Sequence, residues 1–224
     1  MFKTWFQKKN KEDLPSFWRD YDAHFDKKLS KNTPVEAVEF VIFDTETTGL
    51  DIRKDKILSL GAVRLKNNRL NVGDSLDLLI AQAVQKPGKS AEIHGILSTH
   101  IQNGLSEGEA LEQFVTFCKD AVLVGHHVAF DVAMLDQLAR KVVGRRLKNR
   151  TLDTLDLAKR VNPPGAFVRP GDYGLDRLCQ LYQLPTSDRH TAAGDAYITA
   201  LLLMKLLVRL RKRGVHTLGQ LLRR

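Results

Sequence analysis

Apolar residues form three dense runs between residues 39 and 80, and their pattern predicts strands. The run from Glu39 to Asp44 is rich in β-branched and aromatic residues, which is typical of a buried strand. Two further apolar segments, Ile57–Leu65 and Leu70–Ile80, flank Asn67-Asn68. Because asparagine tolerates the positive φ angles of a tight turn, these two segments are predicted to pair as a β-hairpin.

Helical periodicity dominates the rest of the chain, with short apolar runs between the helices. The expected helices are Leu105–Lys119, Phe130–Val143, Tyr173–Tyr182 and Ala192–Arg211. The expected short strands are Ala121–Val124 and Thr151–Asp153. A hairpin followed by alternating helices and strands implies an α/β architecture, in which helices flank a mixed five-stranded sheet.

Residues 1–34 differ in composition from the rest of the chain. They are polar and basic, yet contain both tryptophans and a set of apolar residues that share one stripe of a helix: Leu14, Trp18, Tyr21, Phe25 and Leu29. We expect a helix there, with Asp13 capping its start, Pro15 in its first turn and 30–34 as a short linker. The stripe either packs against the main domain, which we favour, or docks a partner protein.

Bulk composition fits one enzyme-sized domain, expected over residues 35–214, between the helical extension 1–34 and a basic tail at 215–224. The 224 residues, 43% hydrophobic, suffice for a core, and the apolar run at 200–204 is far too short to span a membrane. The N-terminus lacks the apolar centre of a secretory signal. Only two cysteines occur, so no disulfide framework is indicated. We therefore expect a cytoplasmic protein with no membrane partner.

A net charge of +9 and a pI near 9.6 favour a polyanionic partner such as nucleic acid. Basic residues gather in two stretches without an acid, six of them in Arg140–Arg150 and seven in Lys205–Arg224. Taken singly, each stretch is more often a solvated face than a binding site.

Candidate chemistry begins at Asp44 and Glu46, which lie two positions apart at the end of the first predicted strand. Because side chains alternate along a strand, both carboxylates project from the same face. At the edge of a buried core, two unpaired charges are costly unless a cation compensates them. The following turn contains Gly49, which permits close approach of the backbone to a ligand.

Three further polar residues complete the candidate site. Asp131 is near the start of the helix that follows the strand ending at Val124, at the sheet edge where α/β folds place ligands. His190 and Asp195 are five residues apart, about 500° around an ideal helix. We therefore expect His190 on the loop before the helix, Thr191 as the N-cap, and Asp195 in the second turn. With the strand-end pair they supply four carboxylates and a histidine, as a two-metal phosphodiester-cleaving site requires.

The three blocks that contain these residues, 43–50, Phe130-Asp131 and 190–195, resemble the three exonuclease motifs of the DnaQ-like 3′→5′ exonuclease superfamily. The first block reads Phe-Asp-Thr-Glu-Thr-Thr-Gly-Leu, and the His-x-x-x-x-Asp spacing of the third marks the DEDDh branch. Weaker matches at 93–96, 152–158 and 173–179 extend the resemblance over about residues 39–207. It implies a ribonuclease H-like fold.

The resemblance also implies roles for the polar residues. Asp44, Glu46, Asp131 and Asp195 would hold two divalent cations, and His190 would be the general base. Oxygen-only ligands favour Mg²⁺ or Mn²⁺ over zinc. Two such ions roughly 3.5–4 Å apart clamp the attacking and leaving oxygens of a phosphodiester. An imidazole, with an ordinary pKa near ~6.5, takes a proton from water near neutral pH.

Substrate contacts implied by the resemblance are the Thr47 backbone at the terminal 3′-hydroxyl and Leu50 against the terminal base, with His94 and His127 as further substrate-binding candidates. His127 departs from the family pattern, which has Asn four residues before the Asp of the second motif. A histidine reproduces only part of the donor and acceptor capacity of that amide. For His126 and His127, hydrogen bonding or a surface position is favoured over metal ligation.

The leading hypothesis is a metal-dependent 3′→5′ exonuclease that releases nucleoside 5′-monophosphates from single-stranded or frayed DNA. RNA ends or short oligoribonucleotides are the alternative substrates, because nothing in the motifs identifies the sugar. A non-catalytic nucleic-acid-binding module is an alternative of another class, disfavoured because no carboxylate is lost. Only 29 residues follow Asp195. We therefore expect a free-standing or differently docked enzyme, with residues 1–34 as the route to a polymerase or other protein partner.

Overall fold

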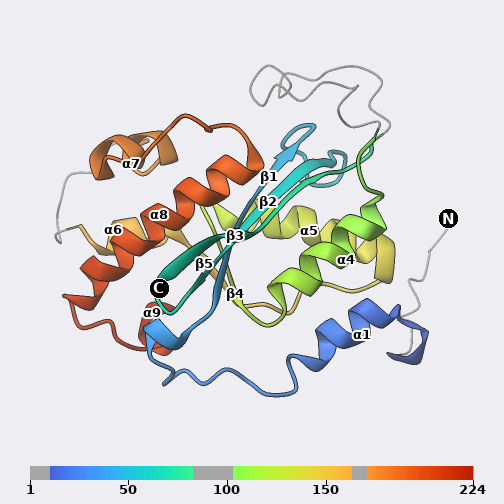
Figure 1. The fold of residues 1–224 in the computed structure, drawn as a ribbon, viewed down its shortest axis with the longest axis horizontal. Coiled ribbons are helices and arrows are strands. Elements are labelled where there is room, and N and C mark those ends of the chain that lie inside the picture. Colours follow the sequence, from blue (N-terminus) through green and yellow to red (C-terminus); the bar gives the residue numbers. More distant parts are fainter. Residues whose placement is uncertain (1–10, 83–102, 163–170, 224) are drawn as a thin grey trace, which may run out of the picture.

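A mixed sheet with strand order β3-β2-β1-β4-β5 organises the chain in the computed structural model, which describes residues 11–82, 103–162 and 171–223 (Figure 1). The strands are β1 (Phe40–Thr47), β2 (Ile57–Lys66), β3 (Arg69–Leu79), β4 (Val122–Gly125) and β5 (Thr151–Asp153). β1 is antiparallel to β2 and parallel to β4, and β4 is parallel to β5. The predicted five-stranded α/β architecture is confirmed.

The β2–β3 hairpin turns at Asn67-Asn68, as the sequence predicts. Both residues have left-handed φ angles, 52° and 57°, which is the backbone that a two-residue turn needs to match the twist of its strands. The hairpin places β2 beside β1, with Gly61 directly opposite Asp44.

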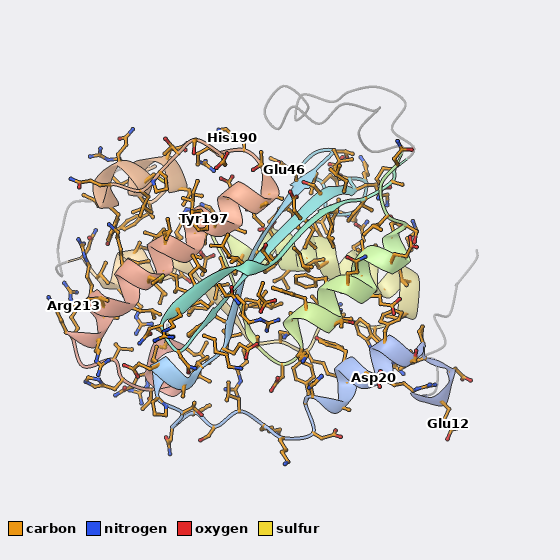
Figure 2. All side chains as sticks on the ribbon, in the orientation of Figure 1. Glu12, Asp20, Glu46, His190, Tyr197 and Arg213 are labelled. Carbon is orange, nitrogen blue, oxygen red and sulfur yellow. The ribbon has the colours of Figure 1, made fainter. Side chains whose placement is uncertain are left out.

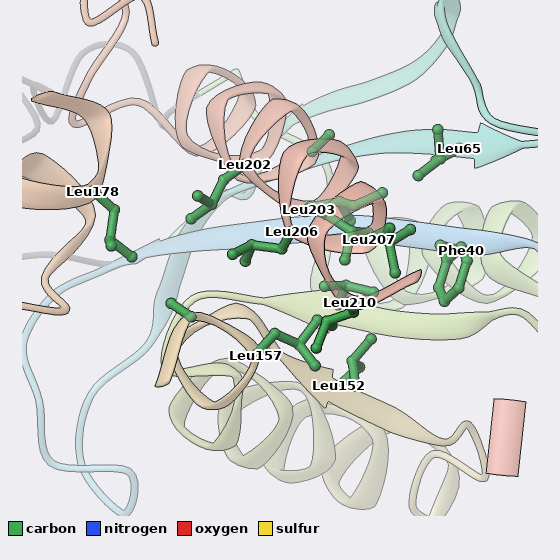
Figure 3. Close-up of a cluster of buried hydrophobic side chains, with 14 of the residues drawn as sticks. Phe40, Leu65, Leu152, Leu157, Leu178, Leu202, Leu203, Leu206, Leu207 and Leu210 are labelled. Atoms are coloured by element: carbon green, nitrogen blue, oxygen red, sulfur yellow. The ribbon is translucent and has the colours of Figure 1, made fainter. Parts of the chain in front are cut away.

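Helices cover both faces of the sheet (Figure 1). On one face, α4 (Glu107–Cys118) and α5 (Val128–Val143) pack against inward side chains such as Val41 and Phe43. On the other face, α6 (Thr154–Arg160), α7 (Leu175–Tyr182) and α8 (Ala192–Arg211) pack against Phe40 and Ile42. Figure 3 shows this second core, in which leucines of α8 lie against Phe40 and Leu65. Successive residues of β1 therefore face different helical layers.

The N-terminal extension contains a helix, α1 (Ser16–Ala23), that is shorter than expected. Asp13 belongs to a preceding 3₁₀ turn, η1 (Lys11–Asp13), and the N-cap is Pro15 without a side-chain bond, so the predicted Asp13 cap is wrong. Trp18 and Tyr21 are buried in the same core as α4 and α5. The Tyr21 hydroxyl donates to Asn149 Oδ1 (2.6 Å) and accepts from the Lys148 amide (2.7 Å). The aromatic stripe thus packs inward, the alternative favoured from the sequence.

Residues near the C-terminus pack against the chain that precedes β1. The short helix α9 (Leu218–Leu221) buries Leu218 and Leu221, and Thr217 forms an antiparallel bridge with Pro34, just before η2 (Val35–Ala37). Several residues of the two basic stretches are used in internal contacts: Lys141 pairs with Glu107, Lys148 with Asp22, and Arg211 with Glu36. No helix in the described ranges is long and apolar enough to cross a membrane.

Candidate active site

The end of β1 carries two carboxylates on the face that α8 covers. Asp44 and Glu46 are half-buried, while Thr45 and Thr47 between and after them are buried toward the other face. This is the same-face arrangement that strand alternation predicts. A change of register between Glu46 and Thr47 marks the point where regular pairing with β2 is interrupted.

Gly61 allows α8 to reach these carboxylates. It lies opposite Asp44 on β2, and a Cβ there would be 2.2 Å from the carbonyl carbon of Ala192 and the amide nitrogen of Ala193. No side chain fits into that space, because real Cβ atoms do not approach other atoms below 3.0 Å. The first turn of α8 therefore rests on the backbone of β2, immediately beside Asp44.

The loop before α8 is tightly fitted to the helix start. Thr191 is the N-cap: its hydroxyl accepts from the Gly194 amide (3.0 Å) and donates to the Asp188 carbonyl (2.9 Å). A Cβ on Gly194 would lie 1.9 Å from that same carbonyl oxygen. His190 has a left-handed φ of 66° and is exposed. The predicted loop position of His190 and the Thr191 cap are confirmed, whereas Asp195 lies in the first helical turn rather than the second.

Three of the four predicted carboxylates converge directly. One oxygen each of Asp44, Glu46 and Asp195 lies within 4.8 Å of the others. Asp131 comes from α5 and is buried beside them, and its Oδ1 accepts from the amide (3.1 Å) and hydroxyl (2.5 Å) of Thr45. Thr45, which lies between Asp44 and Glu46 on β1, thus holds the Asp131 carboxylate next to theirs.

Burial, with added repulsion from neighbouring carboxylates, raises the pKa values of Asp44, Glu46 and Asp131. Burial holds the pKa of Asp44 well above its usual range, and the neighbouring carboxylates add to the effect. Burial, then Asp195 and Asp131, raise the pKa of Glu46 to about 7. Burial also raises the pKa of Asp131 to about 6, against the hydrogen bonds from Thr45 that favour its charged form. Such a set of oxygen ligands fits divalent cations, because cations remove the repulsion that keeps these groups protonated.

Arg189 supplies positive charge to the cluster and was missed from the sequence. Its guanidinium forms an ion pair with Asp195 and donates from Nε to Asp176 Oδ1 (2.7 Å). Its side chain is only 13% exposed. The one available signal was its position directly before His190, because an arginine next to a cluster of acids is a natural counter-charge.

The remaining candidates occupy varied positions. Figure 2 shows His190 at the same end of the molecule as Glu46. The Thr47 hydroxyl donates to the Gly49 carbonyl (2.7 Å), and Leu50 is 83% exposed. His127 is exposed and left-handed (φ 61°) at the N-cap of α5, where its amide donates to Asp153 Oδ1 (3.1 Å). His94 lies outside the described residues.

His126, the neighbour of His127, has a hydrogen-bonding role. Its Nδ1 lies 2.9 Å from the Thr154 hydroxyl. Burial lowers its pKa to about 4, so the ring is neutral at neutral pH. The structure thus agrees with the favoured reading of His126 as a hydrogen-bonding residue.

A groove of about 940 Å³ lies at the opposite end of β1 from the carboxylates. Part of its charged lining is paired, since Arg64 bridges Glu39 and Asp74 and stacks on the Phe117 ring (4.4 Å to its centroid). The groove therefore differs from the carboxylate cluster, in which negative charge exceeds positive charge.

Comparison with solved structures finds the same fold in DNA-bound nucleases. Escherichia coli exonuclease I in complex with a dT13 oligonucleotide superposes with a TM-score of 0.66, at 18% identity, over 79% of this chain and 42% of that chain. Exonuclease X in complex with 5′ overhanging duplex DNA gives a TM-score of 0.57, at 20% identity, over 82% of this chain and 96% of that chain. The ribonuclease H-like fold expected from the sequence is confirmed.

Curated relatives are much longer than this chain. It is 35% identical over 195 residues to a DNA polymerase III subunit epsilon-like protein of Rhodobacter capsulatus, covering 85% of this chain and 27% of the relative. It is 31% identical over 183 residues to a PolC-type DNA polymerase III of Caldanaerobacter subterraneus, covering 82% of this chain but 12% of the relative. The exonuclease family model RNase_T matches residues 41–203, which include all four carboxylates and His190. The chain therefore belongs to this exonuclease family.

Proposed function

We propose that this chain is a metal-dependent 3′→5′ exonuclease that hydrolyses the terminal phosphodiester bond of single-stranded or frayed DNA and releases nucleoside 5′-monophosphates. The observation that carries the proposal is the convergence of Asp44, Glu46 and Asp195, with Asp131 beside them, next to the loop of His190. DNA is the favoured substrate because the relatives are named as DNA polymerase III proteins and the structural neighbours hold DNA.

The four carboxylates are the proposed ligands of two divalent cations, Mg²⁺ or Mn²⁺. Such ions, when bound, lower the pKa of water and stabilise negative charge on a phosphodiester. Asp44, Glu46 and Asp195 offer oxygens to a shared space, and Asp131 keeps its Oδ2 available while Thr45 holds its Oδ1.

His190 is the proposed general base. Its side chain is exposed, so its ring can meet a water at the end of a nucleic-acid chain, and the contacts of Thr191 and Gly194 with the Asp188 carbonyl fix the backbone on both sides of His190. A fixed base reduces the entropy lost on reaching the reactive geometry.

The exposed turn after β1 is the proposed platform for the terminal nucleotide. Leu50, with 83% of its surface exposed, offers an apolar face to the terminal base, and the Thr47 backbone is placed by its hydroxyl bond to Gly49. His127 and His94 stay predicted substrate contacts. A polymerase or other partner bound through residues 1–34 also stays a prediction, and it requires the outer side of α1, where Figure 2 labels Asp20, because Trp18 and Tyr21 face inward.

The experiment is a gel assay of purified protein on single-stranded DNA and RNA, labelled at the 3′ or the 5′ end, with Mg²⁺, Mn²⁺ or EDTA. We expect early release of the 3′ label as mononucleotide, and a ladder that shortens from the 3′ end when the label is at the 5′ end. Faster cleavage of RNA than of DNA would move the substrate assignment to RNA.

The matched variant is Asp44→Ala, which removes one cluster carboxylate from the end of β1. We expect it to lose activity with both metals. Cleavage that continues in EDTA, or at an unchanged rate in this variant, contradicts the metal-dependent mechanism. If the wild-type protein binds DNA but cleaves neither polymer with any metal, the non-catalytic binding module is the correct function.

A further inference from the structure

The guanidinium of Arg189 lies where the cluster carboxylates meet the loop before α8. Its Nη1 pairs with Oδ1 of Asp195, a member of the carboxylate cluster, and its Nε donates to Asp176 Oδ1 on α7. The Arg189 and Asp195 side chains are 13% and 10% exposed, whereas that of Asp176 is 70% exposed. One arginine thus bridges a buried acid that faces the metal site and an exposed acid at its rim.

The backbone sets the direction of this side chain. Asp188, directly before Arg189, is held by the Thr191 hydroxyl and by the close approach of Gly194. The left-handed backbone of His190 then turns the chain sharply, so two adjacent residues differ in environment: Arg189 is half-buried and paired with acids, while His190 is exposed. Arg189 is therefore an inward-facing counter-charge and not a mobile surface arginine.

Arg189 also acts on the acids that it does not touch. Its charge lowers the pKa values of Asp44 and Glu46, opposing the repulsion from the other carboxylates. A divalent cation bound by the same carboxylates performs the same neutralisation with twice the charge. The guanidinium and the cation therefore draw on the same Asp195 carboxylate and stabilise the same set of charges.

We propose that Arg189 is a resident counter-cation that competes with divalent metal for Asp195, and that Asp176 is the second anchor on which Arg189 remains when the metal takes that carboxylate. This inference rests on the proposed metal site. The two anchors use different guanidinium nitrogens, so the Nη1 bond can break while the Nε bond persists. Metal affinity is then set by how strongly Arg189 prefers Asp195 over Asp176.

Two substitutions should change metal affinity in opposite directions. Arg189→Gln removes the competitor and its repulsion of the cation, so Mn²⁺ should bind about tenfold more tightly, a coupling of ordinary size between two sites. Asp176→Asn removes the negative charge of the outer anchor and shifts Arg189 toward Asp195, so Mn²⁺ should bind several-fold more weakly. Arg177→Gln is the matched control, because it removes one positive charge from α7 whose partner is Gln180 and not a cluster acid.

The measurement is Mn²⁺ binding to the full chain without nucleic acid, by calorimetry and by electron paramagnetic resonance, after removal of metal with EDTA. Thermal unfolding of the same samples is the second readout. In EDTA at pH 8 we expect Arg189→Gln to melt at a lower temperature than the wild type. Added Mn²⁺ should raise the melting temperature of Arg189→Gln by more than it raises that of the wild type. Arg189→Lys keeps the charge but offers one donor nitrogen in place of the two that contact Asp176 and Asp195, and it should bind Mn²⁺ with an affinity between those of Arg189→Gln and the wild type.

The possible results distinguish failure of the Arg189 competition from failure of the proposed metal site. Equal Mn²⁺ affinity in Arg189→Gln and Arg177→Gln, or weaker binding in Arg189→Gln than in wild type, overturns the competition while leaving the metal site intact. A purely supporting role for Arg189 predicts weaker binding in both the Arg189→Gln and Asp176→Asn variants. If the wild-type protein itself binds no Mn²⁺, the proposed metal-dependent function fails first, and this inference fails with it.

Discussion

Replacing Gly61 by alanine adds one methyl group between the carboxylates of β1 and the start of α8. The new Cβ would lie 2.2 Å from the backbone of Ala192 and Ala193, whereas ordinary van der Waals contact begins at 3.4 Å. The strand and the helix would therefore have to separate by about 1.2 Å, because the atoms that clash are backbone atoms of packed elements and not the ends of flexible side chains.

This displacement reaches the proposed metal site directly, since Asp195 is in the same helical turn as the residues that clash. Catalytic groups tolerate misplacement of about 0.5 Å, and an error of about 1 Å costs roughly 100-fold in rate. Overpacking of a filled space destabilises by about 1–3 kcal/mol. We therefore expect Gly61→Ala to remain folded at 25 °C, to bind Mn²⁺ more weakly, and to cleave DNA at about one hundredth of the wild-type rate.

The assay is the initial rate of mononucleotide release from 3′-labelled single-stranded DNA with Mg²⁺, with Mn²⁺ titration and urea unfolding of the same preparation. Gly73→Ala is the control, because Gly73 is also in a strand but a Cβ there would be 3.6 Å from its nearest neighbour, Asn71 Oδ1. If the two variants show the same activity and the same Mn²⁺ affinity, the close helix–strand contact does not position Asp195, and the reasoning is wrong.

Three further predictions test other parts of the structure. Tyr21→Phe should lower the free energy of unfolding by about 1–2 kcal/mol without changing the cleavage rate, because Asn149 and the Lys148 amide lose their shared partner; an unchanged urea midpoint would contradict the anchoring role of α1. His190→Ala should bind Mn²⁺ as the wild type does but turn over roughly 100- to 1,000-fold more slowly, and full activity in a single-turnover assay would remove it as general base. The pKa of Glu46 is about 7 in the folded state against an ordinary value of 4.5. Between pH 4.5 and 7 the folded state therefore keeps the Glu46 proton, while the unfolded state loses it. The metal-free protein should therefore lose stability as pH rises from 4.5 to 7, by about 2 kcal/mol after allowance for partial exposure. Thermal melting in EDTA across this pH range measures the loss of stability, which should be smaller in Glu46→Gln. An equal loss of stability in both proteins would assign the pH dependence to other groups.

Local sequence patterns predicted the strands, turns and helices because each of these elements has its own characteristic residue types and spacing. The β-branched run of β1, the Asn67-Asn68 turn and the long, largely apolar segment of α8 appear in the structure where the sequence places them. The loop position of His190 followed from angular spacing alone. Thr191 could be identified as an N-cap because its side-chain bond is made within one helical turn.

Long-range contacts could not be read from the same patterns. The bond from Thr45 to Asp131 joins residues 86 positions apart, and the contact of Gly61 with the start of α8 depends on tertiary packing. The aromatic stripe of the N-terminus predicted a longer helix than α1, because Phe25 also packs against the core from beyond the helix end. Arg189 escaped notice because its pairing with Asp176 requires α7 to lie beside the loop before α8.

The order of the four carboxylates along the chain determines when the cluster can form during synthesis. Asp44 and Glu46 are synthesised first, Asp131 follows, and Asp195 comes on the long helix α8 near the C-terminus. A nascent chain on the ribosome therefore lacks part of the cluster until α8 has emerged and packed against β2. The proposed nuclease site is therefore complete only after α8 has packed, so fragments truncated before α8 lack Asp195 and should not cleave nucleic acid.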